Sequence, residues 1–296
     1  MLPHTTTQPS ISTSPFPTIH PPSTPKKTKH RHSPHNTPHF SYQKPHLLQT
    51  GFSDEATINA SVQSFHVGGS IITTIRDFFN PDTCQSIINT CKSQLSASDT
   101  PLQKLPLKNQ ITFTESLFNK LRPILINQNI PSSYIDHNQT QWNLSYIGKD
   151  FKFTHYKTQG LFPKHFDAQV LSDDGMSRSK YSIIIYLNSL TKDTGNTHFY
   201  NDKKDPLPVQ AISPTEGRIV IFDQNICHEG AKCFDDKYIL RMDLYYTRTT
   251  PLTEQQQQAL SHYRQAEAFA DNGDSQQAIY HFNQASKLNI DNLIHN

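Results

Sequence analysis

The sequence lacks long apolar runs, because no segment approaches the roughly 18 consecutive apolar residues that a membrane-spanning helix needs. No apolar stretch follows the first methionine, so we expect neither a membrane anchor nor a secretory signal peptide. Cysteine is scarce, with four residues and no CxxC pair, which is typical of free thiols in a reducing compartment. These absences together predict a cytoplasmic or nuclear protein.

The first 50 positions lack aspartate and glutamate altogether, while they hold ten of the 20 prolines and seven of the 16 histidines. Such a composition buries too little apolar surface to offset the entropy of ordering, so it predicts a disordered tail over residues 1–50. Its basic run "KKTKHRH" suits nuclear import or polyanion binding, although a plain solvated tail is the simpler interpretation. Organelle import is not favoured, because the tail is rich in proline and poor in arginine.

A globular region is expected over residues 51–250, and its first regular elements are expected to be helices. In "DFFNPDTCQSIINTCKSQL", Asn80 can cap a helix and Pro81 fits its first position. Apolar residues then recur at helical spacing, which predicts one buried face. A second helix is expected around residues 115–126, where Pro123 would introduce a kink or an early end. We expect both helices to support a sheet.

Short runs of β-branched and aromatic residues follow over residues 141–247, separated by Gly, Asp, Asn and Pro. These runs are "WNLSYI", "FKFTHY", "YSIIIYL", "THFY", "VQAI", "RIVIF" and "YILRMDLYY". This pattern is typical of a sandwich or barrel of short antiparallel strands. The polar interval "DAQVLSDDGMSRSK" is expected to be a loop beside a site or a merely disordered one.

Residues 253–296 change back to a helical pattern. The segment "ALSHYRQAEAFADNGDSQQAIYHFNQASKLNID" resembles one tetratricopeptide unit, with "NGD" as the turn between two helices. One repeat cannot bury its own apolar face, so we favour a hairpin docked on the barrel or on another chain over an independent peptide-binding array. Self-association or partner docking through these residues is therefore expected.

An imidazole and a carboxylate lie two positions apart in "FPKHFDAQV", at His165 and Asp167. In an extended strand, residues i and i+2 point to the same face, so the two groups can converge on one object. Two histidines and one carboxylate suit Fe(II) in oxygenases, and His228, after the run "RIVIF", is the candidate second histidine. Arg241 lies in a mostly apolar run and needs an anionic partner. Taken alone, His165 and Asp167 fit a surface strand pair equally well.

Five segments in order resemble the iron(II)- and 2-oxoglutarate-dependent dioxygenases, most closely their prolyl 4-hydroxylase-like branch. They are "HYKTQGLFPKHFD", "YSIIIYLN", "GNTHFY", "GRIVIFDQNICHEG" and "KYILRMDLYY", and they cover roughly residues 145–247. The upstream segment "IRDFFNPDTCQSIINTC" is also similar to the strand and helix before the family's barrel. The sequence departs from the family at Asn196, where a second glycine commonly stands.

The resemblance implies a mainly β fold, a double-stranded β-helix or jelly-roll, with supporting amino-terminal helices and the carboxy-terminal hairpin. It implies that Fe(II), 2-oxoglutarate and O₂ are used, with ascorbate as a candidate reductant. The implied site residues are His165, Asp167 and His228 for iron and catalysis, and Arg241, Tyr156 and Tyr186 for 2-oxoglutarate. In this scheme Arg241 holds the far carboxylate, and one of the two tyrosines donates a hydroxyl.

The implied activity is hydroxylation of an unactivated C–H bond, most closely that of a peptidyl proline in a protein or peptide substrate, with release of succinate and CO₂. Two alternatives stay open. One is a non-catalytic scaffold that recruits partners through the helical hairpin, and the other is a dioxygenase that acts on a small molecule. Nucleic acid is not favoured as a partner, because the net charge is only +2 and no basic strand with interleaved aromatic residues is present.

Overall fold

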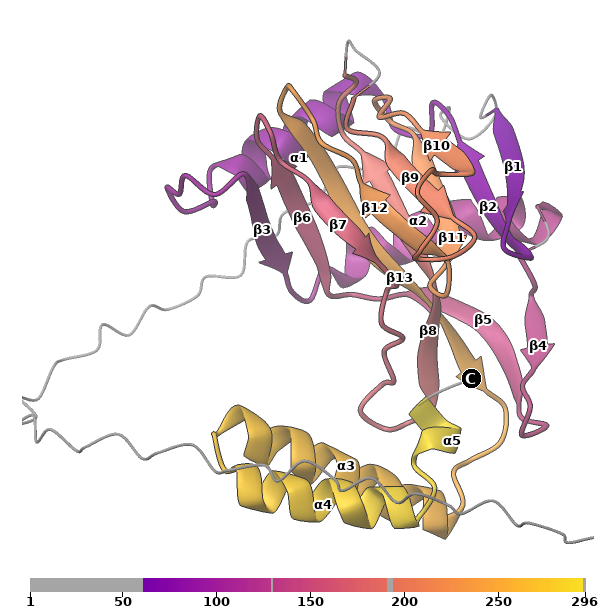
Figure 1. Ribbon diagram of the computed structural model, residues 1–296. Coiled ribbons are helices and arrows are strands. Elements are labelled where there is room, and N and C mark those ends of the chain that lie inside the picture. Colours follow the sequence, from indigo (N-terminus) through magenta and orange to yellow (C-terminus); the bar gives the residue numbers. More distant parts are fainter. Residues whose placement is uncertain (1–60, 129, 191–193, 295–296) are drawn as a thin grey trace, which may run out of the picture. The chain divides into compact units, whose positions relative to one another are not determined.

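Two antiparallel β-sheets pack face to face, with helices α1 and α2 behind the larger one (Figure 1). The computed structural model describes residues 61–128, 130–190 and 194–294, which all fall within one compact unit, Pro45–Asn296. The larger sheet contains β1 (Val62–Val67), β2 (Ser70–Ile75), β3 (Leu102–Leu107), β4 (Ser133–Ile135), β5 (Gln141–Ile147), β6 (Phe151–Tyr156), β8 (Ser177–Tyr186), β11 (Ile219–Asp223) and β13 (Lys237–Arg248). The smaller sheet contains β7 (Phe162–His165), β9 (Thr197–Tyr200), β10 (Gln210–Ile212) and β12 (Cys227–Gly230). The predicted mainly β fold of the jelly-roll type is confirmed.

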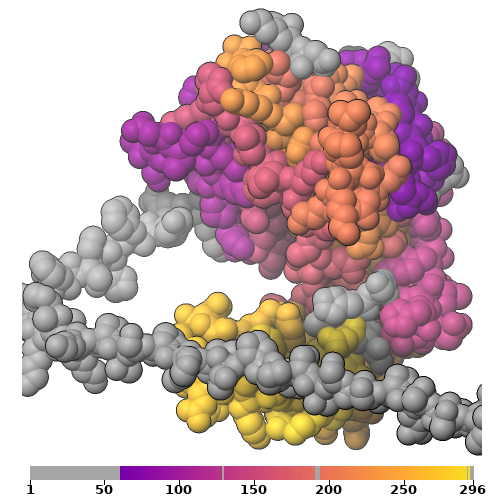
Figure 2. Space-filling view, in the orientation of Figure 1, coloured from indigo at the N-terminus to yellow at the C-terminus, as the bar shows by residue number. Residues whose placement is uncertain are grey.

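The strand order brings segments that are distant in the sequence side by side. The larger sheet runs β1-β2-β11-β8-β13-β5-β4, and β13 also pairs with β6, which pairs with β3. The smaller sheet runs β10-β9-β12-β7. In Figure 2, side chains of the segment that contains β9 and β10, in orange shades, form part of the face in view. The pairing of β7 with β12 is the one that builds the site.

The central strands of the larger sheet are buried on both faces. Ile183 and Ile185 of β8 pack toward the helices, whereas Ile184 and Tyr186 pack toward the smaller sheet. A strand that is covered on both faces reads as a continuous apolar run, which is how "YSIIIYL" appears in the sequence. The sheet is therefore a rigid support with a layer of core on each side.

Two helices cover the outer face of the larger sheet. Helix α1 (Pro81–Lys92) begins as predicted, since the Asn80 side chain accepts a hydrogen bond from the backbone of Thr83 at 2.8 Å. Helix α2 (Ile111–Asn127) is longer than predicted, and Pro123 lies inside it without ending it. The turn before β11 fits tightly against the segment that leads into α1, because a Cβ at Gly217 (φ +73°) would lie 2.1 Å from the carbonyl oxygen of Phe79.

The carboxy-terminal part consists of α3 (Glu254–Asp271), α4 (Ser275–Lys287) and the short α5 (Asp291–Ile294). Leu252 and Leu260 belong to a small apolar cluster that includes Met176 of the loop before β8. Gly175 (φ +69°) allows this approach, because a Cβ there would lie 2.7 Å from Leu260 and 2.8 Å from Leu252. The helical hairpin is thus present and contacts that loop, and its tetratricopeptide-like character stays a prediction.

The predicted tail over residues 1–50 lies outside the described residues. Among the helices of the described part, none combines the length and apolar character needed to cross a membrane. The division into a tail, a dioxygenase domain and a separate hairpin domain stays a prediction.

Candidate metal centre

Three side chains with metal-binding atoms meet where the two sheets face each other. His165 ends β7, and His228 lies directly opposite it on β12. Asp167 follows two residues after the end of β7, and ligand atoms of all three residues lie within 4.8 Å of one another. The two predicted ligands of the "HFD" motif do converge, but Asp167 reaches the centre from the loop and not from the same face of a strand.

Hydrogen bonds orient both imidazole rings toward the carboxylate of Asp167. Nδ1 of His165 lies 2.8 Å from the carbonyl oxygen of Pro163, and Nδ1 of His228 lies 3.0 Å from that of Ile226. A carbonyl accepts only from a protonated nitrogen, so Nε2 of each ring keeps its lone pair whenever that ring is neutral. These Nε2 atoms lie 3.5 Å and 3.7 Å from the carboxylate oxygens of Asp167.

The protonation states also suit a cation. Burial lowers the pKa of His228 to about 4, so its ring is neutral at physiological pH. Burial alone would raise the pKa of Asp167, but the neighbouring His165 ring and the charge of Arg241 outweigh it, so the pKa lies well below its usual range. Two imidazoles and one carboxylate with open positions form the donor set that non-haem Fe(II) oxygenases use. The residues present therefore fit Fe(II).

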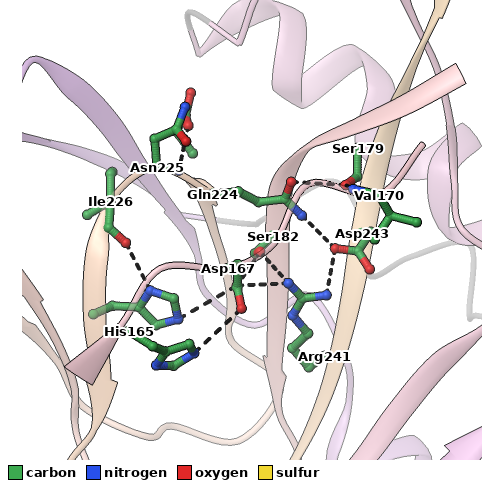
Figure 3. Close-up of polar contacts among 12 residues, drawn as sticks. His165, Asp167, Val170, Ser179, Ser182, Gln224, Asn225, Ile226, Arg241 and Asp243 are labelled. Carbon is green, nitrogen blue, oxygen red and sulfur yellow. Dashed lines mark hydrogen bonds and ion pairs between the residues drawn. The ribbon is translucent and has the colours of Figure 1, made fainter. Parts of the chain in front are cut away.

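A polar network fixes Asp167 from behind (Figure 3). Ser182 donates a hydrogen bond to its Oδ2 at 2.5 Å, and a guanidinium nitrogen of Arg241 lies 2.8 Å from the same oxygen. The other terminal nitrogen of Arg241 lies 2.5 Å from Asp243, whose carboxylate accepts a second hydrogen bond from Gln224 at 2.6 Å. Such outer partners set the orientation of a metal ligand.

Arg241 was expected to hold the far carboxylate of 2-oxoglutarate, and its contacts argue against that role. Its guanidinium is already paired with two carboxylates, Asp167 and Asp243. A cation that is neutralised twice has little attraction left for a third anion. Arg241 instead orients the carboxylate of Asp167, one of the three candidate metal ligands.

A cavity of about 330 Å³ opens beside the metal centre. Its lining consists of Lys104, Lys152, Thr154, Tyr156, Phe162, His165, Phe166, Asp167, Ala168, Val170, Ile184, Thr197, His228, Gly230, Lys237, Ile239, Arg241 and Asp243. Of the two tyrosines predicted to contact the cosubstrate, Tyr156 lines this cavity. Tyr186 does not, because it is buried in the core with its hydroxyl 2.6 Å from that of Thr197.

Lys237 is the cavity residue that sequence reasoning missed. It is 1 % exposed, and burial lowers its pKa to about 8. Its Nζ donates to the carbonyl oxygen of Gly195 at 2.8 Å and lies 3.9 Å from the centroid of the Tyr156 ring, and no carboxylate of the described residues pairs with it. Strand alternation could have found it, since it shares the strand and face of Arg241 at a spacing of four.

Comparisons with known proteins agree with this geometry. Residues 151–242 match the family described as the 2OG-Fe(II) oxygenase superfamily, and this range includes the three candidate ligands and Lys237. The family uses Fe(II), 2-oxoglutarate and O₂. No curated protein matches the chain.

Solved structures of low sequence identity share parts of the fold. A prolyl-4-hydroxylase from Pseudomonas putida is 16% identical with a TM-score of 0.42, and the match covers 60% of this chain and 93% of that one. A viral collagen prolyl hydroxylase from Paramecium bursaria Chlorella virus-1 is 18% identical with a TM-score of 0.41 and coverages of 60% and 96%. A prolyl hydroxylase from Trichoplax adhaerens, solved with a peptide fragment of hypoxia inducible factor, is 16% identical with a TM-score of 0.41 and coverages of 60% and 83%.

Proposed function

We propose, from the premise that residues 151–242 form a 2OG-Fe(II) oxygenase family domain, that this protein is a dioxygenase that hydroxylates an unactivated C–H bond. The observation that carries the proposal is the meeting of His165, Asp167 and His228 at the edge of a cavity, with both Nε2 atoms directed at the carboxylate. Bound Fe(II) with 2-oxoglutarate and O₂ supplies the oxidation, in which the cosubstrate yields succinate and CO₂ and one oxygen atom enters the substrate.

The chain's own residues have three tasks in this scheme. His165, Asp167 and His228 would hold the iron and leave its remaining positions open to the cavity. Lys237 would bind the far carboxylate of 2-oxoglutarate, because it is a buried cation without an anionic partner in the described part of the chain. The ring of Tyr156 lies against the Lys237 ammonium group and lines this end of the cavity.

The substrate is, in this proposal, a prolyl residue of a protein or peptide. Phe166 and Val170 support it: both line the cavity and are 50% and 44% exposed, so an apolar ring carried by a surface segment can pack on them. The four cysteines are free thiols, which suits the proposed location in the cytoplasm or nucleus. Ascorbate would serve as an external reductant.

The test is succinate release from 2-oxoglutarate with Fe(II), together with mass spectrometry of proline-containing peptides. The wild-type protein should release succinate and add one oxygen atom to a peptide, and His165→Ala should do neither. His198→Ala is the matched control, because His198 lies outside the metal-binding set and pairs with Glu229. A wild-type protein that binds partners yet releases no succinate would favour the scaffold alternative, and oxygen transfer to a small acid would favour the small-molecule one.

A further inference from the structure

The cavity carries more positive charge than the metal centre and its cosubstrate can use. Four cationic side chains and two carboxylates line it. Fe(II) and 2-oxoglutarate have equal and opposite charges, so their binding leaves the excess unchanged. Both carboxylates pair with Arg241, and Lys237 is assigned to the cosubstrate. The excess therefore resides on the two remaining cations, Lys104 and Lys152.

Lys104 and Lys152 occupy neighbouring positions on one face of the larger sheet. Lys104 of β3 lies opposite Thr154 of β6, two residues from Lys152. Lys152 in turn lies opposite Arg241 of β13. Residues that are directly opposite, or two apart on one strand, share a face. Three cations thus point to the same side of the sheet, toward the cavity that they line.

This group is separate from the cation assigned to the cosubstrate. Arg241 and Lys237 are four residues apart on β13, so their Cα atoms are about 13 Å apart along an extended strand. One molecule of 2-oxoglutarate with its keto-acid end on iron has one free carboxylate and can satisfy only one of these two positions. If Lys237 takes it, Lys104 and Lys152 beside Arg241 stay open to a different anion.

Neither lysine of this pair has a carboxylate within ion-pairing distance in the part of the chain that the structure describes. Nζ of Lys104 lies 4.1 Å from the centroid of the Phe162 ring, a contact that attracts the cation without neutralising it. Burial lowers the pKa of Lys104, and the nearby charges of Lys152 and Arg241 lower it further, whereas the carboxylate of Asp167 raises it. Like charges held together at a cavity attract an incoming anion.

We infer that the substrate is anionic and places a carboxylate on Lys104 and Lys152, while its apolar part packs on Phe166 and Val170. The carboxylate belongs to an aspartate or glutamate next to the oxidised residue of a peptide, or to a small free acid, and the recognising chemistry is the same. The exposure of both lysines and both apolar residues favours the peptide. The inference rests on the proposed function for the position of iron, but it is tested by binding and not by turnover.

The experiment measures the affinity of labelled peptides for the full-length protein loaded with Mn(II) and the inert analogue N-oxalylglycine, by fluorescence anisotropy. The probes are Gly-Asp-Pro-Asp-Gly and the same peptide with asparagine or lysine in place of both aspartates. Unlabelled N-acetylproline and its uncharged amide compete against them, which distinguishes a small acid from a peptide. Succinate release by the Fe(II) form is recorded separately.

We expect the aspartate peptide to bind about tenfold more tightly than the asparagine peptide, since an exposed ion pair contributes up to about fivefold and two lysines act together. Lys104→Met with Lys152→Met should abolish this preference, and Lys104→Glu with Lys152→Glu should transfer it to the lysine peptide. Lys203→Met with Lys204→Met is the matched control, because both lysines are exposed and lie outside the cavity. This control should keep the wild-type preference.

Equal affinities for the aspartate and asparagine peptides, or no binding of any probe, would overturn the inference. A different outcome is that N-acetylproline competes more strongly than its amide, with this difference lost in the double methionine variant. That result would support the inference, with a small free acid in place of a peptide as the carrier of the carboxylate. An aspartate preference without any succinate release would leave the inference standing and count against the proposed function alone.

Discussion

Replacing Lys237 by methionine tests how the site recognises its cosubstrate. The side chain is 1 % exposed, and its ammonium group faces the cavity without a carboxylate partner in the described part of the chain. Removing one partner of a buried charge pair typically costs about 2–5 kcal/mol of binding free energy. Since the Lys237 pKa of about 8 keeps the group mostly protonated at pH 7, we expect 2-oxoglutarate to bind at least about 30-fold more weakly in Lys237→Met.

The same substitution should not unfold the protein. Burial lowers the pKa of Lys237 from 10.5 to about 8, which corresponds to about 3 kcal/mol against the charged form in the folded state. Methionine has a similar length and carries no such penalty, although it gives up the hydrogen bond to Gly195. We therefore expect a melting temperature equal to or above that of the wild type, so that weaker binding cannot be ascribed to loss of structure.

The assay is isothermal titration calorimetry of 2-oxoglutarate into the Mn(II)-loaded protein, with Lys203→Met as the exposed control. Mn(II) affinity is measured in parallel by electron paramagnetic resonance. A change of less than about threefold in Lys237→Met would refute the assignment. Loss of 2-oxoglutarate binding in Arg241→Met with unchanged Mn(II) affinity would return the far carboxylate to Arg241.

Three further predictions concern the metal, the pH and the fold. His228→Ala should weaken Mn(II) binding by at least about 100-fold in the same resonance titration, whereas His198→Ala should leave it unchanged. Because the anion needs the protonated form of Lys237, 2-oxoglutarate affinity should be constant below pH 8 and fall about tenfold per pH unit above it, as calorimetry can show; a flat profile to pH 10 would contradict this. Gly217→Ala should lower the free energy of unfolding by about 2–4 kcal/mol in chemical denaturation, because the left-handed backbone and the 2.1 Å approach to Phe79 both resist a side chain. An unchanged midpoint would contradict it.

The convergence of the candidate metal ligands could be predicted because their chemistry is visible in residue types and order. His165, Asp167 and His228 converge as expected. Strand periodicity gave the wrong backbone conformation for Asp167. β7 ends at His165, and the loop after it turns the carboxylate inward. A backbone turn of this kind depends on long-range contacts, such as the hydrogen bond from the Asp167 amide to the carbonyl oxygen of Gln224. Local sequence patterns do not predict such contacts.

The roles of the cations could not be predicted from the sequence. Arg241 was singled out because a charged residue in an apolar strand needs an anion, which is correct. Its anions turned out to be Asp167 and Asp243, one of them only two positions away on the same strand face. Lys237 is the first residue of β13, a position at which the sequence suggests an exposed lysine. The structure shows that it is buried and pairs with Tyr156 of β6. Charge recognition depends on burial, and burial is a property of the assembled fold.

Strands at the edges of the sheets escaped prediction for a related reason. β3 carries a proline and two polar residues, so its sequence pattern of apolar residues is weak. An edge strand tolerates such residues because it pairs on one side only, here with β6. Lys104 reaches the cavity through this strand, which lies before the range that matches the oxygenase family. Residues outside a family's matched range can therefore still line its site.

The close approach of Gly175 to Leu252 and Leu260 has a bearing on how small a working version of this protein can be. The loop that leaves Asp167 continues to Gly175, and Arg264 of α3 donates a hydrogen bond to the backbone of Leu171 in the same loop at 2.8 Å. Truncating the chain after β13 would remove the apolar contacts of this loop with Leu252 and Leu260 and its hydrogen bond with the Arg264 guanidinium. The helical hairpin thus supports the segment that carries Asp167, a candidate metal ligand, and the smallest version of the chain that keeps this site intact extends beyond the β-sheets.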